Sequence, residues 1–474
     1  MKRYQALAAE IEASIRSGVL RPGDRLPSVR HTSISRRVSA STVFQAYYLL
    51  EGSGLVRAKS RAGYFVSQSN AALPVLHQPS QPQTGAVAVD VTESIFQVLE
   101  ASTKRSMVPF GSAFPSPLLF PLARLGKAMA TSAKTLSAWN TLDDLSPGKA
   151  ALRRHIALRY AADGMQVHPD EIVITNGALE ALNLCLSVLT RPGDCVLVES
   201  PTFYAALQAL ERLHLKAVEV PTHPGYGVDL GALEDAIRRH KPKAAWMMTT
   251  FQNPLGCTMP EEMKADLVAL LARYQVPLVE DDVYAELYFK PNRPLPAKAF
   301  DKEGLVLHCS SFSKSLAPGY RIGWAAPGRF ARAVARQKLA TTLSTSAPAQ
   351  LGLVKYLEGG GFDKHLRKLR QTLAQRQSVF SEAAGRHLPQ GSLATRPEGG
   401  YFLWVELPPG SDAMKLHQLA LAKGISLAPG PIFSASPGFT RCIRLNFSYA
   451  LDAKGERALE TLGQLACAPE AQSG

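Results

Sequence analysis

The N-terminal part of the chain places apolar side chains at the spacing of helices. Leu7, Ile11 and Ile15 lie on one helical face, and Gly18 marks the end of this first helix. A second, short helix is predicted to start at about Ser28. A third is predicted from residue 39, a serine whose hydroxyl suits an N-cap. The apolar face of the third helix consists of Val43, Ala46, Tyr47 and Leu50.

Two short apolar runs after the third helix, at residues 54–57 and 64–66, predict strands around a tip at residues 59–63. Three helices and a β-wing together predict a winged helix-turn-helix. Residues 1–67 carry eleven Lys and Arg against four Asp and Glu, which is +7 of the chain's +14. A basic stripe of this kind is typical of phosphate binding, although charge alone leaves open a merely solvated basic face.

The central part of the chain shows short continuous apolar runs, which are typical of strands buried on both faces of a parallel sheet. Four of these runs end in polar segments. The runs and the segments after them are Val196–Val198 before Pro201–Phe203, Ala244–Met248 before Asn253–Gly256, Val276–Val279 before Asp281–Tyr284, and Leu305–Leu307 before Lys314. Ligands in an open α/β sheet lie outside the carboxyl ends of the strands. We therefore expect the four segments to meet in one crevice.

Residues 68 to about 93 lack any hydrophobic period. Prolines 74, 79 and 82 and a polar run from Gln78 to Thr84 are typical of a flexible to semi-extended linker. We therefore divide the chain into a winged domain at residues 1–68, a linker at 69–98 and a larger domain at 99–474. The larger domain is expected to have a large part at about 145–340 and a small part at about 341–474.

At 474 residues, of which 46% are hydrophobic, the chain is long enough for several domains. No apolar run reaches the length of a membrane span, and Glu10 and Glu12 interrupt what a signal peptide would keep apolar. The six cysteines are scattered without a Cys-x-x-Cys pair, and the eleven histidines lack His-Glu-x-x-His spacing. These features predict a cytoplasmic protein that uses neither a membrane nor a metal.

Lys314 lies between hydroxyl residues directly after an apolar run. A lysine amine can form a Schiff base with an aldehyde, and Ser311, Ser313 and Arg321 offer two neutral donors and one cation to a dianionic phosphate. The stretch therefore favours a pyridoxal phosphate site. One alternative is a solvated loop lysine. Another is the Ser-x-x-Lys nucleophile of penicillin-binding enzymes, which needs Ser-Asp-Asn and Lys-Thr-Gly partners that do not occur in this chain.

In their order along the chain, these motifs resemble those of the fold-type-I aminotransferases over roughly residues 100 to 465. The resemblance implies an α/β pyridoxal-phosphate-dependent transferase fold, with a large domain built on a mainly parallel sheet and a smaller C-terminal α+β domain. It implies that Lys314 binds the cofactor covalently and that Asp281 pairs with the protonated pyridine nitrogen. Both residues would be catalytic in an enzyme.

Further contacts follow from the same resemblance. Asn253 and Tyr284 would hydrogen-bond the phenolic oxygen of the cofactor, and Phe203 occupies the position of a stacking aromatic. Arg444 resembles the arginine that binds a substrate α-carboxylate. A turn at residues 175–182 opens a helix, whose positive end suits a phosphate. The N–H groups expected there are those of Gly177, Ala178 and Leu179.

The N-terminal domain resembles the GntR family of bacterial regulators. The resemblance rests on the stretches Arg25–Arg30 and Val38–Val43. It implies that hydroxyls at the start of the third helix reach phosphates and base edges of operator DNA. The residues expected to face DNA are Arg25, Arg30, Ser39, Ser41, Thr42, Arg61 and Gly63.

The chain also departs from these families. The second predicted helix carries Thr32, Ser33 and Arg36 where relatives have apolar residues, which predicts weaker packing, and Ala40 stands where many relatives have an arginine. Residues 142–147 lack the aromatic that relatives carry before Gly148. In the enzymes that aromatic reaches the cofactor phosphate of the partner subunit, so its loss argues against full transaminase activity.

Taken whole, the chain is similar to the MocR subfamily of GntR regulators, in which a winged helix-turn-helix is fused to an aminotransferase-like domain. The similarity implies a transcription regulator that binds operator DNA, pyridoxal phosphate and an amino-acid or vitamer effector. It also implies a homodimer whose DNA-binding domains are exchanged between subunits. A metabolic aminotransferase with an accessory DNA-binding domain is the main alternative. A regulator whose cofactor fold serves only for dimerisation is a third.

Overall fold

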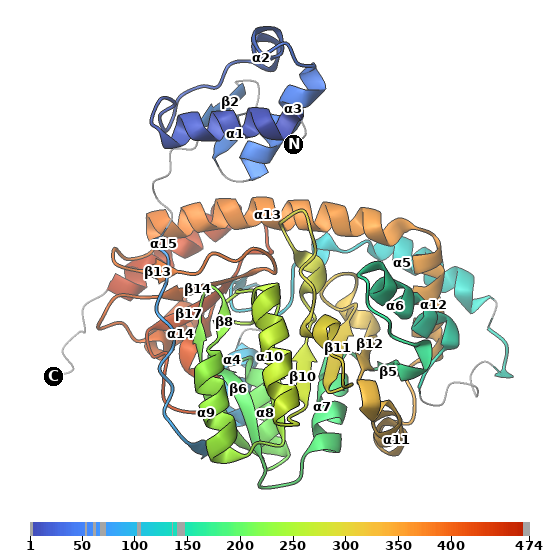
Figure 1. The fold of residues 1–474 in the computed structure, drawn as a ribbon. Coiled ribbons are helices and arrows are strands. Elements are labelled where there is room, and N and C mark those ends of the chain that lie inside the picture. Colours follow the sequence, from blue (N-terminus) through green and yellow to red (C-terminus); the bar gives the residue numbers. More distant parts are fainter. Residues whose placement is uncertain are drawn as a thin grey trace.

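The structure is a computed structural model that describes residues 3–52, 55–59, 63–66, 73–101, 106–134, 136–139 and 147–467. Arg61, one of the residues expected to face DNA, lies outside this range, as do residues 142–146, where the family aromatic is missing. The N-terminal domain forms a small unit beside the long helix α13 of a much larger body (Figure 1). Within the described residues, no helix combines the length and the apolar character that a membrane crossing requires.

The N-terminal domain has the predicted three helices and two-stranded wing. Its elements are α1 (Arg3–Arg16), α2 (Val29–Ser35), α3 (Ala40–Gly52), β1 (Val56–Lys59) and β2 (Gly63–Val66), with β1 and β2 antiparallel. The expected apolar faces meet in one core that contains Leu7, Ile11, Val43, Tyr47 and Leu50. The weaker packing expected at α2 is offset by a polar contact, because buried Thr32 shares a 2.7 Å hydrogen bond with the Tyr47 hydroxyl.

A nine-stranded sheet forms the centre of the body, with the order β3-β7-β6-β9-β10-β11-β12-β5 and β8 paired to β7. Its strands are β3 (Ala86–Ala88), β5 (Val173–Thr175), β6 (Cys195–Ser200), β7 (Lys216–His223), β8 (Gly227–Val228), β9 (Ala244–Met247), β10 (Leu278–Asp281), β11 (Val306–Ser311) and β12 (Gly323–Ala326). The run from β7 through β6, β9 and β10 to β11 is parallel, so the four predicted strands end at the same edge.

Helices cover both faces of this sheet, which explains why its strands are apolar without alternation. Val196 and Val198 pack into a core with α7 and α8, whereas Leu197 between them packs on the opposite face with α9 and α10. The helices of this domain and its flank are α5 (Leu122–Ala133), α6 (Ala150–Ala162), α7 (Ala178–Leu189), α8 (Tyr204–Arg212), α9 (Leu230–His240), α10 (Glu261–Arg273) and α11 (Ala331–Thr341).

The C-terminal part of the body is a smaller α+β domain. Its antiparallel sheet has the order β13-β14-β17-β16, with β13 (Leu393–Ala394), β14 (Phe402–Glu406), β16 (Ala428–Pro429) and β17 (Cys442–Asn446). The helices around it are α12 (Ala347–Glu358), α13 (Gly361–His387), α14 (Ala413–Ala422) and α15 (Ala453–Cys467). A separate parallel pair joins β15 (Ile425–Ser426) to β4 (Val108–Pro109). The predicted combination of fold classes is confirmed.

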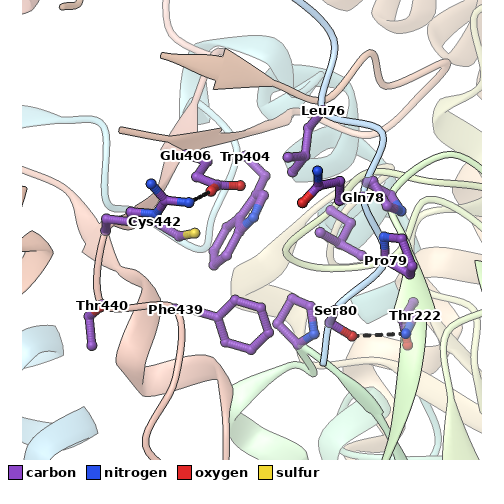
Figure 2. A pocket seen from close by; sticks show the side chains of 14 residues that line it. Leu76, Gln78, Pro79, Ser80, Thr222, Trp404, Glu406, Phe439, Thr440 and Cys442 are labelled. Atoms are coloured by element: carbon purple, nitrogen blue, oxygen red, sulfur yellow. Dashed lines mark hydrogen bonds and ion pairs between the residues drawn. The ribbon is translucent and has the colours of Figure 1, made fainter. Parts of the chain in front are cut away.

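Residues 74–101 connect the two domains along a fixed path on the body, which differs from a flexible linker. Leu76 N donates to Ala394 O of the small domain (2.9 Å), and Ser80 N donates to Thr222 O of the large sheet (3.1 Å). β3 then pairs with β7, and α4 (Thr92–Ala101) lies against α8. Backbone groups make most of these contacts, so a polar, proline-rich sequence can dock without a hydrophobic period. We call residues 74–80 the strap (Figure 2).

Candidate functional site

Three of the four predicted strand-end segments line one cavity of about 950 Å³, and the fourth reaches it through Asn253, which lies 3.5 Å from the Tyr284 hydroxyl. It opens where β6, β10 and β11 end, between the large sheet and the segment around β4. Most of the predicted cofactor residues line this cavity: Ala178, Leu179, Phe203, Asp281, Tyr284, Ser311, Ser313, Lys314 and Arg321. Gly177, Asn253 and Arg444 lie just behind this lining and contact it. Residues from Ala178 to Arg321 thus converge at the ends of the parallel strands, and Arg444 joins them from the small domain.

Lys314 lies in the turn that follows β11 and reaches into the cavity. Its Nζ donates to Ala113 O (2.9 Å) and lies 4.5 Å from the centre of the Phe114 ring. Burial, together with the positive charges of Arg444 and Arg321, lowers the pKa of Lys314 to about 7 despite the opposing effect of Asp281. A lowered pKa increases the neutral fraction of the amine near neutral pH, and only a neutral amine can attack an aldehyde.

Asp281 is the last residue of β10 and is 1% exposed. Burial raises the pKa of its carboxyl group to about 7, although a hydrogen bond from the Val283 backbone and the charge of Lys314 act in the opposite direction. Its Oδ1 atom is buried and has no hydrogen-bond partner among the described residues. An unpaired carboxylate oxygen at this depth calls for a donor from a ligand, because an unsatisfied buried charge is costly.

A hydrogen-bonded chain lies behind Asp281. Trp324 Nε1 donates to the Tyr160 hydroxyl (3.0 Å), and this hydroxyl lies 2.7 Å from His308 Nδ1. The other ring nitrogen of His308, Nε2, lies 2.9 Å from Asp282 Oδ2. His308 is the cross-strand neighbour of Glu280 on β10, and Asp282 directly follows that strand. The chain therefore fixes the backbone from which the Asp281 carboxylate projects.

An anion cup forms where the N-terminus of α7 meets the loop after β11. Gly177 has φ +85°, and a Cβ atom at this position would come within 2.5 Å of Arg321 Nη2, which itself donates to Asn176 O (3.1 Å). A Cβ at Gly323 would come equally close to the Gly177 carbonyl carbon. Ser313 Oγ is buried nearby without a partner among the described residues. The two glycines therefore let a guanidinium, a hydroxyl and helix N–H groups converge on one anion.

Arg444 lies on β17 of the small domain and is completely buried. Its Nη1 donates to Asn253 Oδ1 (2.9 Å) and its Nη2 to Gly111 O (2.9 Å), while its Nε has no partner among the described residues. Asn253 Nδ2 in turn lies 3.5 Å from the Tyr284 hydroxyl. The sequence-predicted arginine, asparagine and tyrosine therefore form one connected set across both domains.

Sequence analysis missed several residues of this site. Tyr204 lies beside Arg444, and burial raises the pKa of its hydroxyl although Arg444 opposes the shift. The Tyr401 hydroxyl donates to the same Ala113 carbonyl that accepts from Lys314. Residues 111–114 also line the cavity, where the Gly111 and Ala113 carbonyls accept from Arg444 and Lys314, and such backbone contacts give no side-chain signal. Tyr204 directly follows the predicted Phe203, so only its position next to a strand end could have indicated that it belongs to the site.

The residues expected to face DNA, apart from Arg61 outside the described range, lie on one domain and are largely exposed. Ser39 caps α3: its Oγ accepts from Thr42 N (3.2 Å) and lies 2.8 Å from both the Ser41 and the Thr42 hydroxyl oxygens. Arg30 lies exposed on α2. Arg25 is also exposed and pairs through its backbone with the wing, where its guanidinium lies next to Gly63. The recognition helix and the wing thus present donors from neighbouring elements.

The body site fits pyridoxal phosphate. Lys314 offers an amine whose pKa is lowered, and Asp281 offers an unpaired buried carboxylate oxygen to a protonated ring nitrogen. The anion cup, which the two glycines keep open, offers a place for the phosphate. The Asp281 carboxylate and the cup approach the cavity from different elements, as a ligand with a basic nitrogen and a phosphate would need.

Comparison with known protein families divides the chain in the same way. Residues 125–462 match the family of aminotransferases class I and II, and residues 3–66 match the gntR family of bacterial regulatory proteins. The solved structure of kynurenine aminotransferase from Pyrococcus horikoshii superposes with a TM-score of 0.73 at 31% identity, covering 80% of this chain and 94% of that one.

Curated relatives include both regulators and enzymes. An uncharacterized HTH-type transcriptional regulator of Escherichia coli, YdcR, is 50% identical over 98% of this chain and 99% of its own length. Aromatic-amino-acid aminotransferase 1 of Thermococcus litoralis is 33% identical over 81% of this chain and 93% of its own length. The chain therefore belongs to the MocR type of GntR-family transcriptional regulators, in which a gntR DNA-binding domain is joined to an aminotransferase class I and II domain.

Proposed function

We propose that this protein is a transcription regulator whose aminotransferase-like domain binds pyridoxal phosphate and whose DNA binding responds to an amino-acid effector. The observation that carries the proposal is the cavity at the strand ends, where Lys314, Asp281 and the anion cup occur together in a chain that also has a gntR domain. A chain that used this fold only for dimerisation would have no need to keep an unpaired carboxylate oxygen buried.

Each side chain has a distinct role in this proposal. When bound, pyridoxal phosphate supplies an aldehyde that reacts reversibly with amines and a ring that withdraws electrons. Lys314 offers the neutral amine, and Asp281 holds the ring nitrogen protonated through its free Oδ1. Ser313 and Arg321, with the N–H groups of residues 177–179, hold the phosphate.

Effector binding in this proposal uses Arg444. Its guanidinium donates hydrogen bonds to both Asn253 and Gly111. An effector carboxylate can take the place of the Gly111 carbonyl and accept from two guanidinium N–H groups side by side. Such an exchange shifts residues 111–114, which also contact Lys314 and Tyr401. Binding of a carboxylate at Arg444 therefore also changes the contacts of Lys314.

We further propose a homodimer in the cytoplasm, with DNA-binding domains exchanged between subunits. Large apolar side chains remain exposed around the mouth of the cavity, and Leu118 is 91% exposed. Phe114, Leu122 and Leu179 lie in the same region and are 45–54% exposed. Exposed apolar clusters of this size favour a subunit interface, which would also complete the wall of the cavity.

A metabolic aminotransferase is the second candidate. The specific observation in its favour is that Lys314, Asp281, Asn253 and Arg444 are all present and mutually connected, as turnover of an amino acid would require. The missing aromatic before Gly148 argues against it. The two candidates differ in whether an amino acid is consumed or only sensed.

The test is a titration of pyridoxal phosphate into the apoprotein with and without operator DNA, where the operator comes from genome-wide mapping of bound sites. A ligand that favours one DNA-binding state must itself bind more tightly to that state, and the coupling must be equal in both directions. We expect operator DNA to change cofactor affinity by about 5- to 150-fold. Equal affinities in both titrations, together with steady transamination of an oxo acid, would instead establish the enzyme.

A further inference from the structure

The cavity has a charged end and an uncharged end. Among the described residues that line it, the charged side chains are Lys314, Asp281 and Arg321, and all three belong to the cofactor end. The other described residues of the lining are apolar or neutral and include Leu99, Met107, Leu182, Ala205 and Gln208, whereas Phe114 lies over Lys314 at the cofactor end. A charged ligand side chain packed against these residues would find no opposite charge among them, and burying an unpaired charge costs far more than burying an apolar group.

One part of the uncharged wall comes from the segment that joins the two domains. Leu99 belongs to α4, which directly follows the strap and β3. Ile95 and Val98 of the same helix are buried in a cluster that also contains Tyr204 and Trp404, whereas Leu99 remains half-buried at the cavity. A ligand side chain that reached Leu99 would therefore touch the segment that leads from the DNA-binding domain.

The start of α4 is fastened to the helix that forms the neighbouring wall. Glu211 Oε2 on α8 accepts from Val91 N (2.8 Å), Thr92 N (2.9 Å) and Thr92 Oγ1 (2.9 Å). The same helix α8 carries Tyr204, Ala205 and Gln208 toward the cavity. Because of these hydrogen bonds, a ligand that lies between α4 and α8 affects the position of both helices.

The strap continues this connection toward the DNA-binding domain. Leu76 packs in the same cluster as Trp404 and α4, and Figure 2 shows it above the Trp404 ring. Trp404 is the cross-strand neighbour of Arg444, the proposed carboxylate ligand. At its other end Ser80 is held by Thr222 N (2.9 Å) and by Ser200 O (2.5 Å) of the large domain. The strap therefore contacts both domains that surround the ligand.

We propose that α4 forms the side-chain subsite of the effector and that the effector is an α-amino acid with an uncharged, largely apolar side chain that packs on Leu99. This inference rests on the proposed function and makes it specific. The carboxylate binds at Arg444, and the side chain extends toward Leu99, Met107 and Leu182. Because α4 leads into the strap, the side chain that selects the effector also moves the segment attached to the DNA-binding domain.

The experiment titrates the pyridoxal phosphate-loaded full chain with single amino acids and follows the absorbance of the bound cofactor. The panel contains leucine, methionine and phenylalanine, the acids aspartate and glutamate, and the bases lysine and arginine. We expect the apolar group to bind at least about tenfold more tightly than either charged group. Equal or tighter binding of a charged group would overturn the inference.

Two substitutions on α4 locate the subsite. Leu99→Ala should weaken the affinity for leucine and phenylalanine by about 5- to 50-fold and leave pyridoxal phosphate affinity unchanged. The matched control is Phe96→Ala, because Phe96 lies on the same helix, is 56% exposed and is not part of the cavity wall. Equal loss in both variants would overturn the assignment of Leu99.

A second variant covers the case in which Leu99→Ala lowers stability instead. Leu99→Phe keeps the apolar character of α4 and fills the subsite, so it should weaken phenylalanine binding more than alanine binding, with thermal unfolding close to wild type. The outcomes also separate the two proposals. Intact cofactor absorbance and operator binding without a response to any amino acid would overturn this inference and leave a cofactor-binding regulator. Failure to bind pyridoxal phosphate at all would overturn both.

Discussion

The DNA-binding domain and the cofactor cavity place their ligand-binding groups in opposite environments. In the N-terminal domain the candidate contacts Arg25, Arg30 and Ser41 are exposed and come from neighbouring elements. In the body, Asp281 and Arg444 are buried and come from strands of two different domains. Exposed cations bind DNA through charge that solvent ions screen, whereas buried groups gain or lose protons and depend little on salt. The DNA-binding domain should therefore respond mainly to salt concentration, and the cavity mainly to pH.

The strongest test of this contrast is Lys314→Ala. Removing the amine eliminates the covalent bond to pyridoxal phosphate, so we expect complete loss of the yellow absorbance band. In wild type, reduction with borohydride should attach the cofactor to a peptide that contains Lys314. A labelled peptide with any other lysine would refute the assignment. DNA binding measured without the cofactor should be unaffected, because the exposed contacts lie on the other domain.

The pH dependence of cofactor binding should show the effect of burial. The pKa of Lys314 is lowered to about 7, so its neutral fraction rises about tenfold per pH unit below that value and levels off above it. The rate at which absorbance develops after mixing apoprotein with pyridoxal phosphate should rise up to about pH 7 and then flatten. Asp281 raises the pKa of Lys314, so Asp281→Asn should move the midpoint to lower pH. A rate that still climbs at pH 10 would indicate an exposed lysine.

Asp281→Ala should have a smaller effect on the same site. It removes a charge-assisted hydrogen bond to the ring nitrogen, which is worth about 1.5 to 3 kcal/mol. Cofactor affinity should therefore fall by about 10- to 150-fold while Lys314 can still react. Equilibrium dialysis measures the change. Unchanged affinity would show that the unpaired Oδ1 does not face the ring nitrogen.

On the exposed side of the comparison, Arg30→Ala should weaken operator binding by about 1 to 3 kcal/mol if Arg30 reads a base, and should relax preference at that base pair. The matched control is Arg36→Ala, because Arg36 has similar exposure but pairs with Glu10 at 2.9 Å. Affinity of the wild type should fall steeply with salt. Binding that is independent of salt would exclude the basic surface as the interface.

The fold, and the convergence of most candidate cofactor residues on one cavity, could be predicted because both rest on local signals. Apolar runs identify β6, β9, β10 and β11, and the rule that ligands lie at strand ends brings their polar segments together. The partners of Arg444 could not be predicted, since Gly111 contributes only a backbone carbonyl from a position far away in sequence. The strap was missed for the same reason. Backbone pairing gives no side-chain pattern, so residues 74–80 look like free linker.

The smallest predicted effect concerns the core of the DNA-binding domain, where sequence analysis expected weak packing. The Tyr47 hydroxyl donates to Pro27 O (2.7 Å) and shares a 2.7 Å hydrogen bond with Thr32 Oγ1. Since the tyrosine has one proton, Thr32 must be the donor in the second bond. Tyr47→Phe leaves both partners unpaired and should cost about 1 to 3 kcal/mol.

Valine has nearly the shape of threonine but lacks its hydroxyl, so Thr32→Val removes only the hydrogen bond to Tyr47 and leaves the bond from Tyr47 to Pro27 intact. It should lower the free energy of unfolding by only about 0.5 to 1.5 kcal/mol. Urea unfolding of the two variants, followed by a signal from the N-terminal domain, measures the difference. A larger loss for Thr32→Val than for Tyr47→Phe would contradict this pair of hydrogen bonds. The expected order would show that a polar pair, rather than the apolar residues of relatives, holds α2 against the recognition helix.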